Sequence, residues 1–203
     1  GTQPGEVALS QNALIAVQVE REQFELALRK ADVIANSTII PERFQKNPAD
    51  VLIALNLADR LGIDKMMVFQ NLYVVYGTPG WSAQFLISMF NQHPGFERIK
   101  YRFTGTKGND DYGCIAYAKD LQTGEEVEGA EVTIAIAKAE NWYSKKGSKW
   151  PTMTDQMLRY RSAAWMIRTV APEIALGFQT IEEVRDVIEG EVTNKRTGSQ
   201  VTG

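Results

Sequence analysis

The chain of 203 residues has 22 basic and 25 acidic side chains, a formal net charge of −3, and 44% of its residues are hydrophobic. These values are typical of a globular chain with one well-buried core. A single cysteine excludes an intrachain disulfide and a cysteine-rich zinc cluster, and a single histidine argues against a Ser-His-Asp triad. No run of about 18 apolar residues occurs, so we expect no transmembrane helix and a cytoplasmic protein.

The first third of the chain predicts helices. Residues 9–35 contain neither glycine nor proline and predict one long helix. A second helix is delimited by Asn47 as its cap, Pro48 at its first position and Gly62 after its end. A short helix is expected over residues 64–70.

The middle of the chain predicts strands. β-branched and aromatic residues over 72–76 predict a strand, followed by a turn over 77–80 and a helix over 81–92. The hydrophobic pattern then changes to a period of two. Three antiparallel strands are expected, over residues 98–103, 112–119 and 126–136.

The order of elements indicates an α+β fold: a small antiparallel β-sheet, a meander plus a short strand or hairpin, packed with several α-helices. A strong helix is predicted over 152–171 and a last one over 180–189. We expect one domain over 9–189, a flexible N-terminus over 1–8 and a disordered tail over 190–203.

Basic residues concentrate in one segment. Residues 138–168 hold seven basic and two acidic side chains, a net of +5 in a chain whose total is −3. Within it, Lys145, Lys146 and Lys149 lie among aromatic residues that include Trp150. Cations for the backbone and flat rings for the bases are what a groove for single-stranded nucleic acid needs. A solvated basic loop is the alternative.

The helix predicted over 152–171 adds a second candidate. Arg161, Trp165 and Arg168 share a stripe at positions i, i+4 and i+7. Arginines bind phosphate with forked hydrogen bonds and an indole stacks on a base, so the stripe is a candidate platform for both. The alternative is an Arg161–Trp165 cation–π contact with salt bridges at a helix interface, and the pattern does not decide between them. The core face is assigned to Met153, Met157, Tyr160, Ala164, Ile167 and Ala171.

The candidate phosphate contacts are therefore Lys145, Lys146, Lys149, Arg159, Arg161 and Arg168, with Trp150 and Trp165 as candidate stacking residues. Lys138 and the strand row Arg98, Lys100 and Arg102 rank second, because glutamates on the third strand are placed to neutralise the row across the sheet.

Conventional catalysis finds little support. No P-loop and no Gly-x-Gly-x-x-Gly pattern after a strand is present. Asp110 and Asp111 are a candidate for divalent-cation binding in a nuclease, with solvated turn residues as the alternative. We expect no catalytic residue, no metal site and no cofactor.

Several blocks resemble the RecT/Redβ superfamily of phage single-strand DNA annealing proteins, in their order and spacing over about residues 47–189. The first group comprises residues 54–63 (ALNLADRLGI), 68–77 (VFQNLYVVYG) and 81–86 (WSAQFL). The second comprises 149–153 (KWPTM), 157–163 (MLRYRSA), 168–173 (RTVAPE) and 177–183 (GFQTIEE). Two departures are the direct Trp150–Pro151 step and Ser162 where the family commonly has alanine.

The resemblance implies an ATP-independent annealing protein that pairs complementary strands in phage or prophage recombination, without bond-making chemistry. It implies single-stranded DNA and the annealed duplex as ligands, and a homo-oligomeric ring or filament. A phage exonuclease and a host single-strand-binding protein are implied as partners, and no membrane is. The alternative is a structural or protein–protein interaction module of a phage that binds no nucleic acid.

Overall fold

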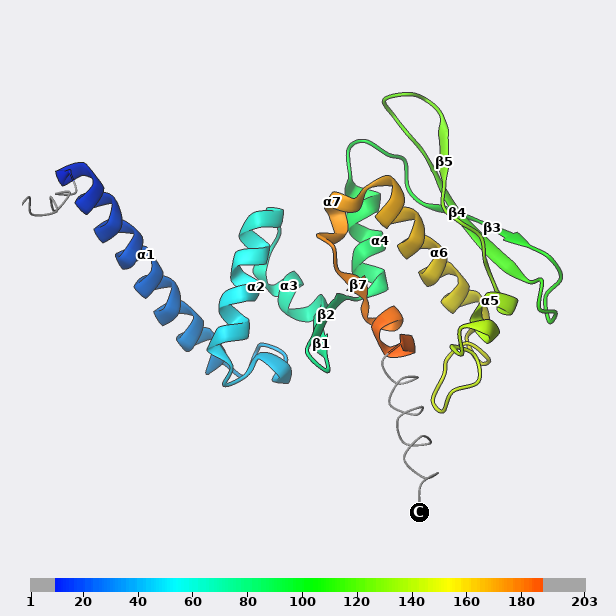
Figure 1. Ribbon diagram of the computed structural model, residues 1–203, viewed down its shortest axis with the longest axis horizontal. Helices are drawn as coiled ribbons and strands as arrows, with labels where there is room; N and C mark the ends of the chain where they lie inside the picture. The colour runs from blue at the N-terminus through cyan, green and yellow to red at the C-terminus, as the bar shows by residue number, and fades with distance from the viewer. Residues whose placement is uncertain (1–9, 188–203) are drawn as a thin grey trace, which may run out of the picture. The chain divides into compact units, whose positions relative to one another are not determined.

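The computed structural model describes residues 10–187 and divides into two compact units, with the boundary between Gln70 and Asn71 (Figure 1). This boundary lies inside the segment that the sequence analysis treats as one domain. The predicted ends, 1–8 and 190–203, lie outside the described residues.

The first unit is helical, as predicted. It comprises α1 (Gln11–Ala35), a 3₁₀ turn η1 (Glu42–Phe44), α2 (Pro48–Leu61) and α3 (Lys65–Asn71). The Asn47 side chain accepts a hydrogen bond from the amide of Asp50, and Gly62 ends α2 in the left-handed conformation with φ +65°. The sequence therefore predicts both ends of α2 correctly, because an N-cap and a left-handed residue at the C-terminal end act within one helical turn.

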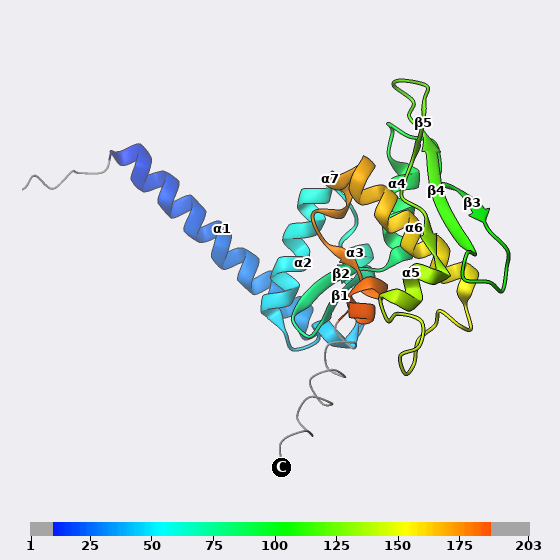
Figure 2. The same ribbon diagram turned by 45° about the vertical axis from the view of Figure 1, so that its right-hand side comes forward.

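The core of the first unit is small. Ala31 and Ala35 are the buried residues of α1, and Val51 and Leu55 are buried on α2. Phe44 meets the Phe69 ring edge-on, with 5.1 Å between the ring centroids. In Figures 1 and 2, α2 lies beside the C-terminal half of α1, so the burial in α1 is confined to that half.

The second unit begins with a hairpin. β1 (Leu72–Val75) pairs antiparallel with β2 (Thr78–Trp81), and Val75 lies opposite Thr78. The turn is therefore Tyr76–Gly77, at φ +48° and +80°, and the turn predicted over 77–80 is wrong in position. Two consecutive left-handed residues match the twist of a two-residue hairpin.

A second sheet follows helix α4 (Ala83–Gln92). Its strands are β3 (Lys100–Thr104), β4 (Gly113–Lys119), β5 (Glu126–Glu128) and β6 (Val132–Thr133). β4 is central and pairs antiparallel with the other three. One face of this sheet packs on α6 (Thr154–Val170), where Ala116 and Ala118 share a core with α4 and α6.

The third predicted strand, 126–136, is wrong in its C-terminal part. β5 ends before Gly129, whose backbone lies so close to α6 that an added Cβ would be 2.7 Å from Cβ of Met166. After β6, the Thr133 hydroxyl accepts from the amide of Ile136 and begins helix α5 (Ile134–Ala139). The apolar run alone did not distinguish strand from helix.

After α6 the chain comes back to the hairpin of β1 and β2. After α6 come α7 (Pro172–Ala175) and β7 (Gln179–Thr180), which pairs parallel with β2. Residues 181–187 are helical; the predicted end of this helix at residue 189 lies outside the described residues. The predicted α+β fold is thus confirmed. No helix within residues 10–187 is long and apolar enough to cross a membrane.

The approach of Gly129 to α6 gives a prediction about stability. Gly129→Ala should lower the free energy of unfolding by about 1–3 kcal/mol, because the new methyl group meets helix backbone that cannot yield easily. Urea unfolding followed by tryptophan fluorescence measures this. Ala130→Ser, at an exposed neighbour, is the control and should change little. Equal stability of the two variants would contradict the close packing.

Candidate nucleic-acid interface

The arginine at the centre of α6 is buried against two stacked indoles. The Arg161 side chain is 4% exposed, and its guanidinium carbon lies 3.7 Å from the ring centroid of Trp142. Trp142 in turn stacks on Trp150, with 5.6 Å between centroids, and Trp150 is fully buried. These rings remove Arg161 from water, and burial lowers the pKa of its guanidinium from the ordinary value.

Asp186, from the last described helix, is the anion that Arg161 pairs with. Its carboxylate binds the Arg161 guanidinium, accepts a hydrogen bond from Trp150 Nε1 at 3.1 Å and lies 3.6 Å from Lys145 Nζ. Burial raises the pKa of the Asp186 carboxyl above its ordinary value, while Trp150, Arg161 and Lys145 act in the opposite direction. Lys145 also donates to the carbonyl of Arg185.

A second buried pair lies one helical turn earlier on the same segment. Arg168 donates two hydrogen bonds to Glu183, at 2.6 and 2.5 Å. Glu183 also accepts from the amide and hydroxyl of Thr180, and its own amide donates to that hydroxyl, so the two residues form a capping box. Burial alone would raise the pKa of Glu183, but Arg168 and the Thr180 amide hold it below its ordinary value.

We refer to Lys145, Arg161, Arg168, Glu183 and Asp186 as the C-terminal ion-pair cluster.

This cluster corrects part of the sequence-based site. Arg161 and Trp150 are buried and their polar atoms are bound, so neither lies where a phosphate or base reaches it. Arg168 and Lys145 have side chains 28% and 13% exposed and are already paired with carboxylates. The two arginines of the α6 stripe pair with the helix over residues 181–187, and Trp165 contacts Trp142. The helix-interface alternative is therefore the observed one, with Trp142 as the cation–π partner.

The six residues assigned to the core face are not all buried. Met157, Ala164, Ile167 and Ala171 are buried, Tyr160 is only partly buried, and Met153, which precedes the first helical residue Thr154, is exposed. Trp165 is partly buried and meets the Trp142 ring edge-on, with 6.3 Å between centroids.

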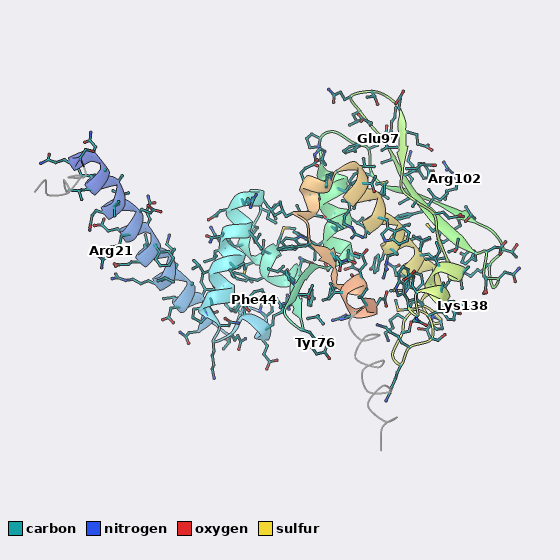
Figure 3. The ribbon with its side chains drawn as sticks, in the orientation of Figure 1. Arg21, Phe44, Tyr76, Glu97, Arg102 and Lys138 are labelled. Atoms are coloured by element: carbon teal, nitrogen blue, oxygen red, sulfur yellow. The ribbon has the colours of Figure 1, made fainter. Side chains whose placement is uncertain are left out.

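The basic row on β3 lies on the outer face of its sheet. Lys100 and Arg102 are exposed, as is Arg98 just before the strand (Figure 3 labels Arg102). Arg102 bridges Glu126 and Glu128, at 2.9 and 3.2 Å, and these hydrogen bonds raise its pKa. Lys100 lies 3.7 Å from Glu97. The expected neutralisation by glutamates is thus observed for Arg102.

The loop before α6 presents its remaining lysines to solvent. Lys146 and Lys149 are exposed and form no ion pair within residues 10–187. The loop is anchored from below, since the Ser148 hydroxyl donates to the Trp142 carbonyl at 2.5 Å and accepts from the Trp150 amide at 3.3 Å. The loop that is hydrogen-bonded to Trp142 and Trp150 therefore presents Lys146 and Lys149 to solvent.

Lys138 forms an ion pair with Asp110, one of the two adjacent aspartates considered as cation ligands. Lys138 Nζ binds Asp110 at 2.6 Å and lies 5.1 Å from the Tyr143 ring centroid (Figure 3 labels Lys138). Asp111 accepts from the amide of Thr106. In the described part of the chain, no group of three His, Cys, Asp or Glu side chains is arranged to hold a metal ion.

Arg159 occupies a setting that sequence analysis missed. Its guanidinium carbon lies 5.1 Å from the Phe103 ring centroid, and Phe103 stacks on Tyr112, with 5.6 Å between centroids. Lys107 lies 6.0 Å from the Tyr112 ring centroid and pairs with Asp155 at 2.9 Å. Strand alternation puts Phe103 on the face opposite Arg102, and no local signal indicates that its ring reaches Arg159 on α6.

No family model matches this chain, and neither the curated proteins nor the solved structures that were searched yield a match.

The buried pair generates a prediction about stability. Arg161→Ala should lower the free energy of unfolding by about 3–5 kcal/mol, because it leaves the Asp186 carboxylate buried without its main partner. Urea unfolding measures this, with the exposed Arg102→Ala as the control that should change little. The double variant Arg161→Met/Asp186→Leu should recover part of the loss. A single variant as stable as the wild type would contradict the buried pair.

The capping box generates a prediction about pH. Because the pKa of Glu183 is lowered by folding from the ordinary 4.5, its contribution is present above that value and is lost as pH falls through the folded pKa. Glu183→Gln should therefore make the loss of unfolding free energy below about pH 4.5 shallower.

The neighbouring Glu182 provides a control of opposite sign. Burial raises its pKa, so its contribution to stability is present below the ordinary 4.5 and is lost as pH rises through the raised folded pKa. Glu182→Gln should therefore make the loss of stability on acidification steeper in the range just above pH 4.5. Urea titrations at several pH values compare the two variants, and equal slopes would contradict the assignment.

Proposed function

We propose that this chain is an ATP-independent protein that binds single-stranded DNA and anneals complementary strands, as a homo-oligomer in recombination of phage or prophage DNA. The observation that carries the proposal is the loop before α6. There, Lys146 and Lys149 are exposed and have no carboxylate partner within residues 10–187, and Ser148 between them hydrogen-bonds to the backbone of Trp142 and Trp150.

The blocks that resemble the annealing proteins support the proposal through residues that maintain the fold. The second group spans the loop, α6, α7 and the capping box, and it contains Trp150, Arg161, Arg168 and Glu183. These residues form buried contacts that hold the C-terminal segment on α6. The resemblance therefore concerns residues that maintain the fold, and contacts to DNA are to be sought among exposed cations around them.

The preferred phosphate contacts are now Lys146, Lys149 and Arg159. Arg159 has no ion pair within the described residues, and its guanidinium lies over an aromatic ring that is itself partly exposed, Phe103. Lys138, with Tyr143 beside it, and the exposed Arg98 and Lys100 form the second rank. Cations and rings in alternation suit a single strand, whose phosphates need neutralising and whose bases stack.

Annealing follows from charge and needs no bond-making chemistry. Two strands repel through their phosphates, and a protein that neutralises one strand lowers the cost of bringing up the second. Base pairing then selects the sequence, so no side chain has to recognise base edges. The resemblance further supports a phage exonuclease and a host single-strand-binding protein as partners and action in the cytoplasm.

One observation favours a second candidate, a protein–protein interaction module without nucleic-acid binding. Large apolar side chains of α1, including Leu14, Val17 and Phe24, are exposed, which is typical of a helix that binds another protein. The two candidates differ in a single measurable property, binding to a DNA strand.

The proposal predicts salt-dependent annealing. The wild-type chain should accelerate pairing of two complementary oligonucleotides without nucleotide, as followed by fluorescence quenching, and the acceleration should fade as salt rises. Lys146→Ala/Lys149→Ala should lower the slope of log affinity against log salt by about 1.4, since each phosphate contact to a single strand contributes about 0.7.

The exposed Lys119, at the far end of β4, supplies the control. Lys119→Ala removes one exposed positive charge, whereas the double variant removes two, and should leave the slope unchanged. A folded wild-type chain that neither binds nor anneals DNA would contradict the proposed function. Wild-type behaviour of the double variant would remove the loop from the site.

A further inference from the structure

Helix α1 exposes apolar side chains on two roughly opposite sides. At about 100° per residue, the two sets are centred about 160° apart around the helix. Face A comprises Leu14, Val17, Phe24 and Leu28, and face B comprises Ile15, Val19, Leu26 and Val33. Their exposed fractions range from 42% to 72%. A helix that is apolar on both sides is typical of one enclosed by partners.

Each face has a distinct relation to the rest of the first unit. Face A continues along α1 from the side on which Ala31 and Ala35 are buried, so the packing surface used against α2 extends beyond it. Face B runs into a groove of about 640 Å³ between α1 and α2, which Leu26 and Val33 line together with Leu52 and Leu55.

The charges around the two surfaces are complementary. The first part of α1, residues 11–25, carries three glutamates and one arginine, a net of −2. The groove is lined by Arg29, Lys30 and Lys65 against one acid, Asp59, a net of +2. An acidic helix that exposes face A therefore matches a basic groove that contains face B, and both belong to the same chain.

We propose that face A of one copy packs against face B and the adjoining groove of a second copy. The partner is the chain itself, because the complementary surfaces occur once each on every copy. The contact joins two different surfaces and is therefore head-to-tail, so it repeats from copy to copy into a ring or filament. A closed two-fold dimer through face A would leave face B exposed.

The contact also accounts for the stability of the N-terminal half of α1. A helical stretch of about 15 residues is marginal in water by itself, and residues 11–26 contribute no fully buried side chain to the first unit. Neighbouring copies supply the missing burial. The inference rests on the homo-oligomer of the proposed function and specifies which surfaces form it.

Sedimentation velocity without DNA tests the contact. The wild-type chain should form species larger than a monomer, whose mass grows with concentration. Val17→Glu/Phe24→Glu removes face A, and Val19→Glu/Leu26→Glu removes face B; each variant alone should be monomeric. Because all four side chains are exposed in the monomer, the substitutions leave the core intact. Gln18→Glu, between the faces, is the control and should assemble like the wild type.

Mixing the two variants gives the sharpest test. The intact face B of the first variant meets the intact face A of the second, so an equimolar mixture should form a species of two chains and stop there. A misfolded variant would not restore this dimer. A monomeric wild-type chain, assembly that survives loss of either face, or a mixture that stays monomeric would each overturn the inference.

The annealing assay keeps this inference separate from the proposed function. A monomeric chain that anneals DNA would overturn the head-to-tail contact and leave the function standing. A chain that assembles as described but does not anneal would overturn the function and leave the contact standing.

Discussion

The second unit depends on two buried carboxylates of the last described helix, Glu183 and Asp186, each of which needs a cation as its partner. Arg168 and Arg161 on α6 supply them. A buried charge without a partner costs several kcal/mol, so the C-terminal segment is stable only where both pairs form. β7 and the Trp81 indole, which donates to the carbonyl of Ala175 at 3.1 Å, attach the same segment to the hairpin.

The cluster also determines which cations remain for a ligand. Arg161, Arg168 and Lys145, which belong to the most basic segment of the chain, are paired with carboxylates in the cluster. Arg161 also packs against two indoles. The same indoles are the base on which the loop with Lys146 and Lys149 stands. One set of buried contacts therefore pairs three of the seven cations of the basic segment and anchors the loop that exposes two others, which couples the stability of the fold to the candidate interface.

The first unit follows a different physical logic. Its buried core is small and its longest helix exposes apolar faces, which in the proposed contact would be buried against a second copy. This complements a site with few cations per chain, because an array of copies multiplies weak contacts along one strand without any new contact type. The proposed assembly through α1 and the proposed DNA binding through the second unit use different parts of the chain and can therefore be tested separately.

The sequence by itself determined the elements whose signals are local: α2 between the Asn47 cap and Gly62, β3 and β4 by alternation, and the α+β class by their order. Tertiary structure alone decided the end of the third strand, where Gly129 meets Met166, and the fate of the α6 stripe. A helical pattern shows that Arg161 and Trp165 share a side, but the partner of Arg161 is Asp186, 25 residues further along the chain. Burial of a charge depends on a partner that folding brings from a distance, and periodicity within one helix holds no information about it.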